Sequence, residues 1–358
     1  MKRLLKILWL VTKWFVAGVV CLEIMAFIAI SVGNYILYGH AREGSRAVYD
    51  AYTLFLQEGG PRETLHNAVS ENPDKNRVIW LFGGSTMRGA TRDDGKTIAS
   101  FLAAFLNAPP DGLRYTVNNY GMNSFNSLLE TKYLQKLLIE CDKPPDLIVF
   151  YDGANDAKYF AEHRTPHGHH GYRRARSLIE SYYRSWFGLL KPLNAAVYAS
   201  FSKELFDKIN QVAVPIDPDS RSLKNMVAEA VRRYDHVDKL AECYGAEFVL
   251  FWQPILWTED CEVPASVKEK ERSFLLNSDR FETVRHNFSI PYLVLADKLK
   301  HEPYFVSLRD ALCKRTTAVY QPDGVHLTDE GRKMAALRIG KVLEKRIKDG
   351  LKQPDTNR

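Results

Sequence analysis

Cysteine is scarce in this chain, and its five residues follow no spacing typical of a metal site. Cys21 lies in an apolar N-terminal run, and the others are scattered over the rest of the chain at Cys141, Cys243, Cys261 and Cys313. Zinc sites use paired ligands a few residues apart, so we expect no metal and no other cofactor. In an oxidising compartment these four cysteines could pair in more than one way, and buried free thiols are an equally good interpretation.

A strong charge of one sign is also missing. The formal net charge is +6. Half of this excess lies in the first forty residues, which carry four basic side chains and one acid, Glu23. The weak excess that remains does not indicate the basic surface that nucleic acid requires, so we expect no nucleic-acid partner.

Internal repeats and low-complexity segments are absent as well. The 358 residues are 46% hydrophobic and 26% charged, which is the composition of a folded chain with a sizeable core. This length allows one large domain or two ordinary ones.

The longest apolar stretch runs from Trp14 to Leu37. As a helix it would reach about 36 Å, enough to cross a hydrocarbon core of about 30 Å with some tilt. It is longer than a signal-peptide core and no small-residue cleavage motif follows it, so we predict a retained transmembrane anchor within residues 1–40.

The basic residues around the anchor predict its orientation. Four precede the apolar stretch closely, whereas only Arg42 and Arg46 follow it closely. The positive-inside rule therefore places the N-terminus in the cytoplasm and the rest of the chain in the periplasm, outside the cell or in a lumen. Glu23 is the one acid within the stretch, and it is either protonated and tolerated or paired with a membrane partner.

After the anchor we expect a connector at 41–76, in which Ala47–Gln57 could form a helical stalk. Short apolar runs between turn residues then predict strands, and amphipathic periodicity predicts helices between them. The expected strands are Val78–Phe82, Tyr115–Tyr120, Asp146–Tyr151, Glu247–Trp252 and Tyr304–Ser307. The expected helices are Thr97–Asn107, Leu128–Glu140, Leu223–Cys243, Val267–Leu276, Phe281–His286 and Gly331–Ile347.

This alternation predicts an α/β fold in which helices cover both faces of a mostly parallel sheet. The core domain would extend over residues 77–348, followed by a tail at 349–358. The turns at Ser85, Gly121 and Gly153–Asn155 each follow a strand. They would meet at one edge, because the carboxyl ends of parallel strands lie together there.

An insert at about 157–222 interrupts the alternation and is rich in histidine, arginine and aromatic residues. Its histidines at 163, 167, 169 and 170 have no carboxylate or cysteine at ligand spacing, which favours a solvated loop over a metal site. The segment Tyr182–Leu193 has three interpretations: packing against the core, a cover over the edge that carries Ser85, or contact with a membrane surface.

Ser85 follows a buried-strand pattern and two glycines, at the place where open α/β sheets bind ligands. A helix N-cap would explain this serine equally well. However, Asp323 and His326 stand three residues apart in QPDGVHLT and supply the other members of a nucleophile, base and orienter set. We expect Asp323 to fix the imidazole of His326 while the other ring nitrogen faces Ser85.

Acyl transfer also needs donors aimed at the developing oxyanion. The backbone N–H groups of Ser85 and Gly121 and the side-chain amide of Asn155 are the candidates. Gly121 and Asn155 are also ordinary turn residues, so each has a purely structural interpretation.

Four blocks, in this order, resemble the SGNH hydrolases, also called GDSL-type esterases and lipases: FGGSTMRG, NNYGMNS, YDGAND and PDGVHLT. The resemblance covers about Val78–Leu343 and implies a three-layer α/β/α sandwich, flavodoxin-like, with an acyl-serine mechanism. By similarity, Ser85 would be the nucleophile, His326 the general base and Asp323 its orienter. The chain departs from the family at Gly84, where an aspartate is usual, which bears on the subfamily more than on the activity. The pattern G-x-S-x-G is absent around Ser85, which argues against the other large serine-esterase fold.

The resemblance and the outward-facing position together predict a serine esterase that hydrolyses or transfers O-acyl groups. Acetyl or short acyl groups on an extracytoplasmic glycan are the first choice of substrate. The aromatic insert keeps a lipase or lysophospholipase acting on membrane lipid esters as an alternative. A third alternative is a non-catalytic glycan-binding or scaffold module of a membrane complex.

Overall fold

The computed structural model describes residues 2–38, 47–109, 112–184, 196–197, 200–210, 214–273 and 279–350. The chain divides into two compact units, each described by itself below. The helical unit contains residues 1–44 and 171–214, and the sheet unit contains residues 45–170 and 215–358.

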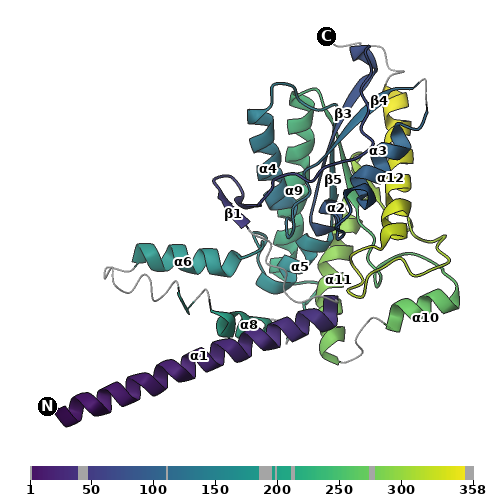
Figure 1. The fold of residues 1–358 in the computed structure, drawn as a ribbon. Coiled ribbons are helices and arrows are strands. Elements are labelled where there is room, and N and C mark those ends of the chain that lie inside the picture. The colour runs from purple at the N-terminus through teal and green to yellow at the C-terminus, as the bar shows by residue number, and fades with distance from the viewer. Residues whose placement is uncertain are drawn as a thin grey trace. The chain divides into compact units, whose positions relative to one another are not determined.

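The sheet unit is built on five parallel strands in the order β4-β3-β5-β6-β7. Figure 1 labels three of these strands, β3, β4 and β5. The central strand β5 is buried along its whole length, as expected for an apolar strand covered on both faces. The predicted mostly parallel sheet is therefore confirmed. The strands are β3 (Asn76–Gly83), β4 (Arg114–Asn119), β5 (Leu147–Asp152), β6 (Glu247–Trp252) and β7 (Phe305–Ser307).

Helices cover both faces of this sheet. Successive strand residues point to opposite faces, so Phe82 joins one core with α4, α9 and α11, whereas Leu81 joins the other with α3 and α12. This arrangement confirms the three-layer α/β/α fold. The helices of the unit are α2 (Ser85–Arg88), α3 (Ile98–Leu106), α4 (Ser127–Glu140), α5 (Ala154–His163), α9 (Arg221–Cys243), α10 (Ala265–Ser273), α11 (Asp279–Leu299) and α12 (Asp329–Gly350), with 3-10 turns at Pro73–Lys75 and Asp94–Lys96.

The predicted helical stalk at Ala47–Gln57 is wrong, because this segment forms an antiparallel hairpin of β1 (Ala47–Asp50) and β2 (Leu54–Gln57). The Asp50 carboxylate accepts hydrogen bonds from the N–H of Tyr52 at 3.0 Å and from the N–H and hydroxyl of Thr53, both at 2.9 Å. These local bonds replace the helical ones and close a turn between the strands.

Helix α11 is also much longer than the predicted Phe281–His286. The helix continues beyond His286 and through Pro291, which has no N–H to donate. In the structure Tyr292, Leu295 and Leu299 are fully buried against the sheet, and this packing outweighs the missing hydrogen bond.

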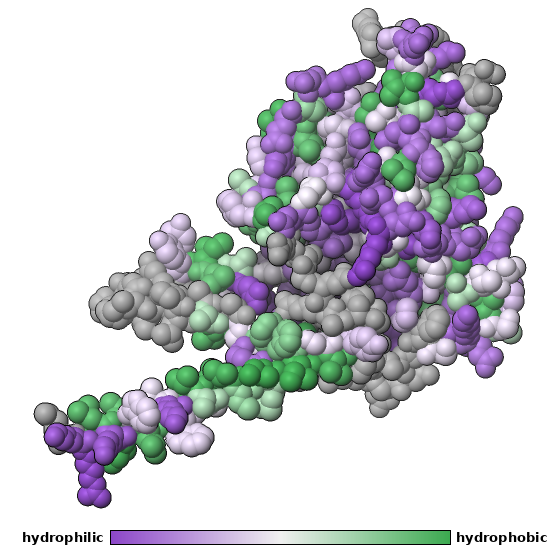
Figure 2. Space-filling view, viewed as in Figure 1, coloured by the Kyte–Doolittle hydropathy of each residue, from purple (hydrophilic) through white to green (hydrophobic). Residues whose placement is uncertain are grey.

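In its described part, the helical unit includes α1 (Lys2–Tyr38), α6 (Tyr172–Arg184) and α8 (Phe201–Asn210). Within α1, the span from Lys2 to Gly33 is long enough to cross a membrane and contains an 18-residue window with a mean hydropathy of 2.5. Figure 2 shows the long hydrophobic stretch of this helix beyond its basic N-terminal end. Its length and composition fit both a retained anchor and a signal sequence.

Glu23 is paired within its own chain. Its carboxylate accepts hydrogen bonds from the first residues of α8, Phe201 and Ser202. Glu23 is therefore not a lone acid, and its partners in the structure lie inside the helical unit.

Candidate active site

Ser85 lies at the carboxyl end of β3, where Gly84 begins the short helix α2. Its Oγ is 2.7 Å from Nε2 of His326, which is 241 residues later in the chain. The structure thus brings together the serine and the histidine that the sequence predicted to meet.

Asp323 and His326 share one loop, just before α12. One carboxylate oxygen of Asp323 accepts the N–H of Val325 and of His326, both at 2.9 Å, and the other accepts from Nδ1 of His326 in a short hydrogen bond. Gly324 makes this loop possible, because its φ is +70° and a Cβ there would lie 2.8 Å from the ring of Trp257. The backbone N–H groups therefore fix the orientation of the carboxylate that binds the imidazole.

The environment of Asp323 keeps its side chain ionised. Burial raises the pKa of this carboxyl, but the hydrogen bond and charge of His326 and the two backbone N–H groups outweigh burial and hold the pKa below its usual range. An ionised acceptor at Nδ1 selects the tautomer with the proton on that nitrogen. Nε2 of His326 is then free to accept the hydroxyl proton of Ser85.

Two of the three predicted oxyanion donors have hydrogen atoms available. Ser85 is the first residue of α2, and N–H groups at that position have no partner within the helix. The Asn155 amide donates to the carbonyl of Phe125 at 2.6 Å. An amide nitrogen has two hydrogens, so a second one remains.

The third predicted donor, Gly121, does not fit. Its N–H donates to the side-chain oxygen of Asn119 at 3.0 Å. In the described part of this turn, the N–H groups of Asn123 and Ser124 have no recorded acceptor. Ser124 also has a φ of +66°, a strained conformation that is often found at functional sites. The sequence did not predict these two N–H groups as donors, because no motif indicates that a serine adopts the left-handed conformation.

The structure explains why glycine replaces the usual aspartate at position 84. A Cβ on Gly84 would collide with the amide nitrogen of Asn155 and would lie 3.2 Å from the carbonyl of Phe125. Asn155 thus lies directly against the turn that carries Ser85, and any side chain at position 84 would push it away.

A buried group of carboxyls supports the turn that carries Asn155. Asp152 and Asp156 flank this turn, and Glu130 of α4 lies beside them. Tyr234 donates to Asp152 at 3.0 Å, and Arg233 lies 3.7 Å from Asp156. Burial raises the pKa of all three carboxyls, that of Asp152 to about 7. The cluster therefore retains protons at neutral pH.

Two of the four cysteines outside α1 are paired with each other. Cys261 and Cys313 form a disulfide, while Cys141 and Cys243 are free thiols. Over the described ranges, no group of three or more His, Cys, Asp or Glu side chains has the geometry of a metal site. Of the aromatic segment Tyr182–Leu193, residues 185–193 lie outside the described residues, and so does the tail from 351 onward.

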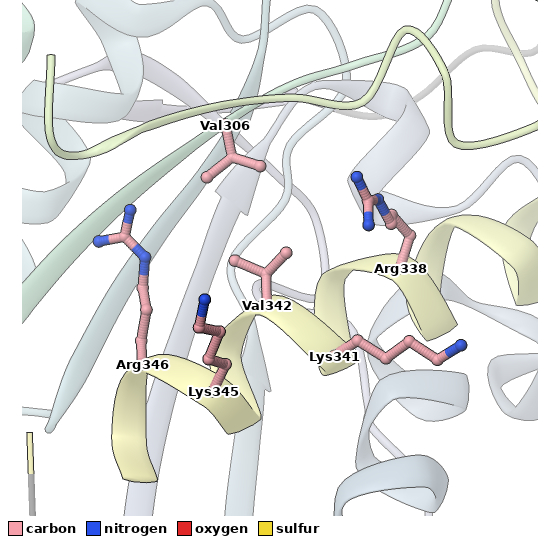
Figure 3. Close-up of a pocket in the computed structure, with 6 residues that line it drawn as sticks. All are labelled: Val306, Arg338, Lys341, Val342, Lys345 and Arg346. Carbon is pink, nitrogen blue, oxygen red and sulfur yellow. The ribbon is translucent and has the colours of Figure 1, made fainter. Parts of the chain in front are cut away.

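A cavity of about 530 Å³ lies apart from Ser85, between β7 and α12 (Figure 3). Its lining is basic with an apolar floor, and two of its four cations are held by acids: Arg338 by Asp310 at 3.5 Å and Arg346 by Glu247 at 2.9 Å. Its lining contains no serine, cysteine or histidine among the described residues. Its lining residues are Val306, Arg338, Lys341, Val342, Lys345 and Arg346.

A parallel sheet with a serine, a histidine and an aspartate hydrogen-bonded in line at its carboxyl edge has the architecture of a serine hydrolase. The chain belongs to the GDSL-like lipase/acylhydrolase family, whose model matches residues 79–339. It is therefore an ester hydrolase, as the resemblance implied. No curated protein matches this chain.

Several solved structures are similar in fold. An acetyl xylan esterase, AlAXEase, has 13% identity and a TM-score of 0.41, and the match covers 74% of this chain and 98% of that one. A lipase/acylhydrolase from Enterococcus faecalis has 15% identity, a TM-score of 0.39 and coverages of 75% and 96%. The esterase EstA from Pseudoalteromonas sp. has 12% identity, a TM-score of 0.38 and coverages of 76% and 99%.

Proposed function

We propose that Ser85, His326 and Asp323 form the catalytic triad of a serine esterase that acts on O-acyl groups by an acyl-serine mechanism. The observation that carries this proposal is the 2.7 Å contact between Ser85 Oγ and His326 Nε2, with Asp323 on the opposite ring nitrogen. The line of hydrogen bonds gives each group the partner that its role requires.

The first half-reaction follows from this geometry. Nε2 of His326 takes the hydroxyl proton as Ser85 Oγ attacks the acyl carbon, and Asp323 stabilises the imidazolium that forms. The N–H of Ser85, the remaining amide hydrogen of Asn155 and the free N–H groups at Asn123 and Ser124 are the donors for the oxyanion. His326 then gives its proton to the leaving alcohol, and the acyl group stays on Ser85.

The second half-reaction repeats these roles with another nucleophile. His326 takes a proton from water, the resulting oxygen attacks the acyl-serine, and the proton returns to Ser85 as the acid leaves. A sugar hydroxyl in place of water would transfer the acyl group instead of hydrolysing it.

We place the reaction outside the cytoplasm, on acetyl or short acyl groups of a glycan. A helix able to cross a membrane precedes the sheet unit, and the basic residues before it favour a cytoplasmic N-terminus. The disulfide between Cys261 and Cys313 is typical of oxidising compartments. A membrane lipid ester is the second candidate, because α8 packs on α1 and leaves Phe206 exposed.

The test is hydrolysis of short and long p-nitrophenyl esters by the full chain, compared with Ser85→Ala, His326→Ala and Asp323→Asn. We expect short esters to turn over, and each variant to lose about 10³-fold or more in kcat with little change in KM. A fluorophosphonate should label the wild-type serine but not Ser85→Ala. If wild type and variants are equally inert and unlabelled, a binding module replaces the esterase.

A further inference from the structure

The helical unit has a specific contact between α1 and the insert. The Glu23 carboxylate accepts the N–H of Phe201 at 2.7 Å, the N–H of Ser202 at 3.2 Å and the Ser202 hydroxyl. These N–H groups belong to the first turn of α8, where a helix has no internal acceptors. Glu23 therefore caps α8 from another helix, and the positive end of the α8 dipole faces its charge.

Side-chain packing extends this contact along one face of α1. Ala26 and Ile30 are only 2% and 4% exposed, whereas their neighbours Met25 and Ile28 are more than half exposed. The rings of Phe27 and Phe201 meet edge-on with centroids 5.1 Å apart. Positions 23, 26, 27 and 30 follow helical spacing, so α1 presents one continuous seat for α8.

The Glu23 carboxylate and the N–H groups that begin α8 satisfy each other's hydrogen bonds, which water could not do inside a bilayer. A carboxylate within a bilayer is costly unless it is paired, and so are the free N–H groups that begin a helix. The contact removes both costs at once. A signal sequence that is cleaved and discarded has no need of such a seat, so the contact favours a retained α1.

The depth of the contact can be bounded from the charges of α1. The Lys13 ammonium lies 5.4 Å from the centre of the Trp9 ring, about one turn nearer the N-terminus than its own backbone. We take the hydrocarbon core to begin at the level of this ammonium, near Trp9 and before the apolar stretch of Trp14–Leu37, so that a span of about 20 residues ends near Ile28. Glu23 would then lie about 8 Å inside the far boundary of the hydrocarbon core.

We propose that α1 is a retained anchor and that α8 is a membrane-associated helix, seated on α1 through Glu23 at the boundary farther from the basic N-terminus. This inference rests on the membrane position proposed above. Phe206 of α8 is 62% exposed and faces the lipid, while the Lys203 ammonium lies 6.0 Å from its ring. Long basic side chains can leave the lipid in this way while their stems stay buried.

The headgroups that fit this module are anionic. The same unit contains α6, which carries four arginines against one glutamate and exposes Ile179, Tyr182 and Tyr183. Arginines on one side and aromatic residues on the other are typical of helices that lie in the interface of an anionic bilayer.

A spin label at position 206 tests the proposal. The full chain carries Phe206→Cys, with Cys21, Cys141 and Cys243 replaced by alanine or serine and the disulfide retained. It is reconstituted into vesicles of phosphatidylcholine with phosphatidylglycerol. We expect the label to be severalfold more accessible to oxygen than to a water-soluble nickel chelate. Ile139→Cys, an exposed position on α4 of the sheet unit, is the matched control and should show the reverse.

Two Glu23 variants test the cap itself in the Phe206→Cys background. Glu23→Ala should release α8, and the ratio of the label's accessibility to oxygen over its accessibility to nickel should then fall to that of the 139 control. Glu23→Gln retains one acceptor oxygen and should keep most of the wild-type ratio. Hydrolysis of a soluble p-nitrophenyl ester should not change in either variant, so the membrane proposal and the esterase proposal fail separately.

Two results would overturn the inference. The first is a 206 label as accessible to nickel as the 139 control in the otherwise wild-type chain. The second is an intact mass showing that the membrane-extracted protein has lost α1.

Discussion

Gly84 has no side chain, and this leaves room for Asn155 to lie against the turn that carries Ser85. Restoring the family's aspartate with Gly84→Asp should lower kcat for a short ester about 10-fold or more, because overpacking a filled site costs about 1–3 kcal/mol and Asn155 must move. Gly84→Ala should show the same effect in weaker form. Gly112→Ala, where a Cβ would have ordinary contacts only, is the control. Unchanged kinetics in Gly84→Asp would show that Asn155 is not needed where the structure places it.

The buried carboxyls around Asp152 predict how stability depends on pH. Burial and the charge of Asp156 raise the pKa of Asp152 to about 7, so the folded chain holds a proton that the unfolded chain releases. A raised pKa gives stability that is full below the unfolded value of about 4 and is lost as pH rises through the folded value of about 7. We therefore expect the free energy of unfolding to fall between about pH 4 and about pH 7.

Urea denaturation across this pH range measures the effect, with Glu130→Gln as the test variant. A neutral amide removes a buried acid whose own pKa is raised well above its usual range, and with it the proton that this acid holds in the folded state. The decline should then flatten by at least about 1 kcal/mol, the size of a shift of one pKa unit. A wild-type curve that is level over this range would mean that the cluster is ionised throughout.

At the scale of residues, the sequence predicted side chains better than backbone donors. Ser85, Asp323 and His326 meet as expected, because their motifs stand at strand ends and in one short loop. The Gly121 N–H could not be judged in this way, since its availability depends on where the Asn119 side chain points. The left-handed conformation of Ser124 and the contact between Gly84 and Asn155 could not be predicted, because no sequence motif indicates them.

The β1–β2 hairpin depends on Asp50, which ties it to another element. Besides closing the turn, its carboxylate forms a short ion pair with Lys136 of α4. Asp50→Ala should lower the free energy of unfolding by about 1–3 kcal/mol, because it leaves buried donors without acceptors. Lys136→Met should cost less, and the double variant should cost less than the sum. Additive effects in thermal unfolding would mean that the two side chains act independently.

Among the elements, strands were predicted to within one or two residues and some helices were not. An apolar run between prolines or glycines has few alternatives to a buried strand, as β5 and β6 illustrate. The hairpin was missed because one turn of Asp50 hydrogen bonds overrides a weak helical pattern. The predicted helix ended at His286, well short of the true end of α11 at Leu299, because the sequence does not show how much apolar surface Tyr292 and Leu295 bury.

At the scale of the molecule, the disulfide joins two loops on the same side of the sheet unit. Cys261 and Cys313 are 52 residues apart, and closing a loop of this length stabilises a fold by at most about 4 kcal/mol in the chain-entropy model. Cys261→Ser with Cys313→Ser should therefore lower the free energy of unfolding by about 2–4 kcal/mol in urea denaturation. Cys141→Ser with Cys243→Ser is the control and should change it far less. An equal loss in both pairs would remove any special role for the disulfide.

Glu23 and its partners on α8 are synthesised at different times. The acid leaves the ribosome 178 residues before its partner Phe201. At a synthesis rate of about 5–20 residues per second, this gap lasts about 10–35 s. With α1 as the retained anchor proposed above, Glu23 would enter the membrane during that interval with no helix to cap, and it would have to be protonated or sheltered by the insertion machinery. Under the same proposal the helical unit assembles in a fixed order, in which the anchor comes first and the insert later compensates its charge.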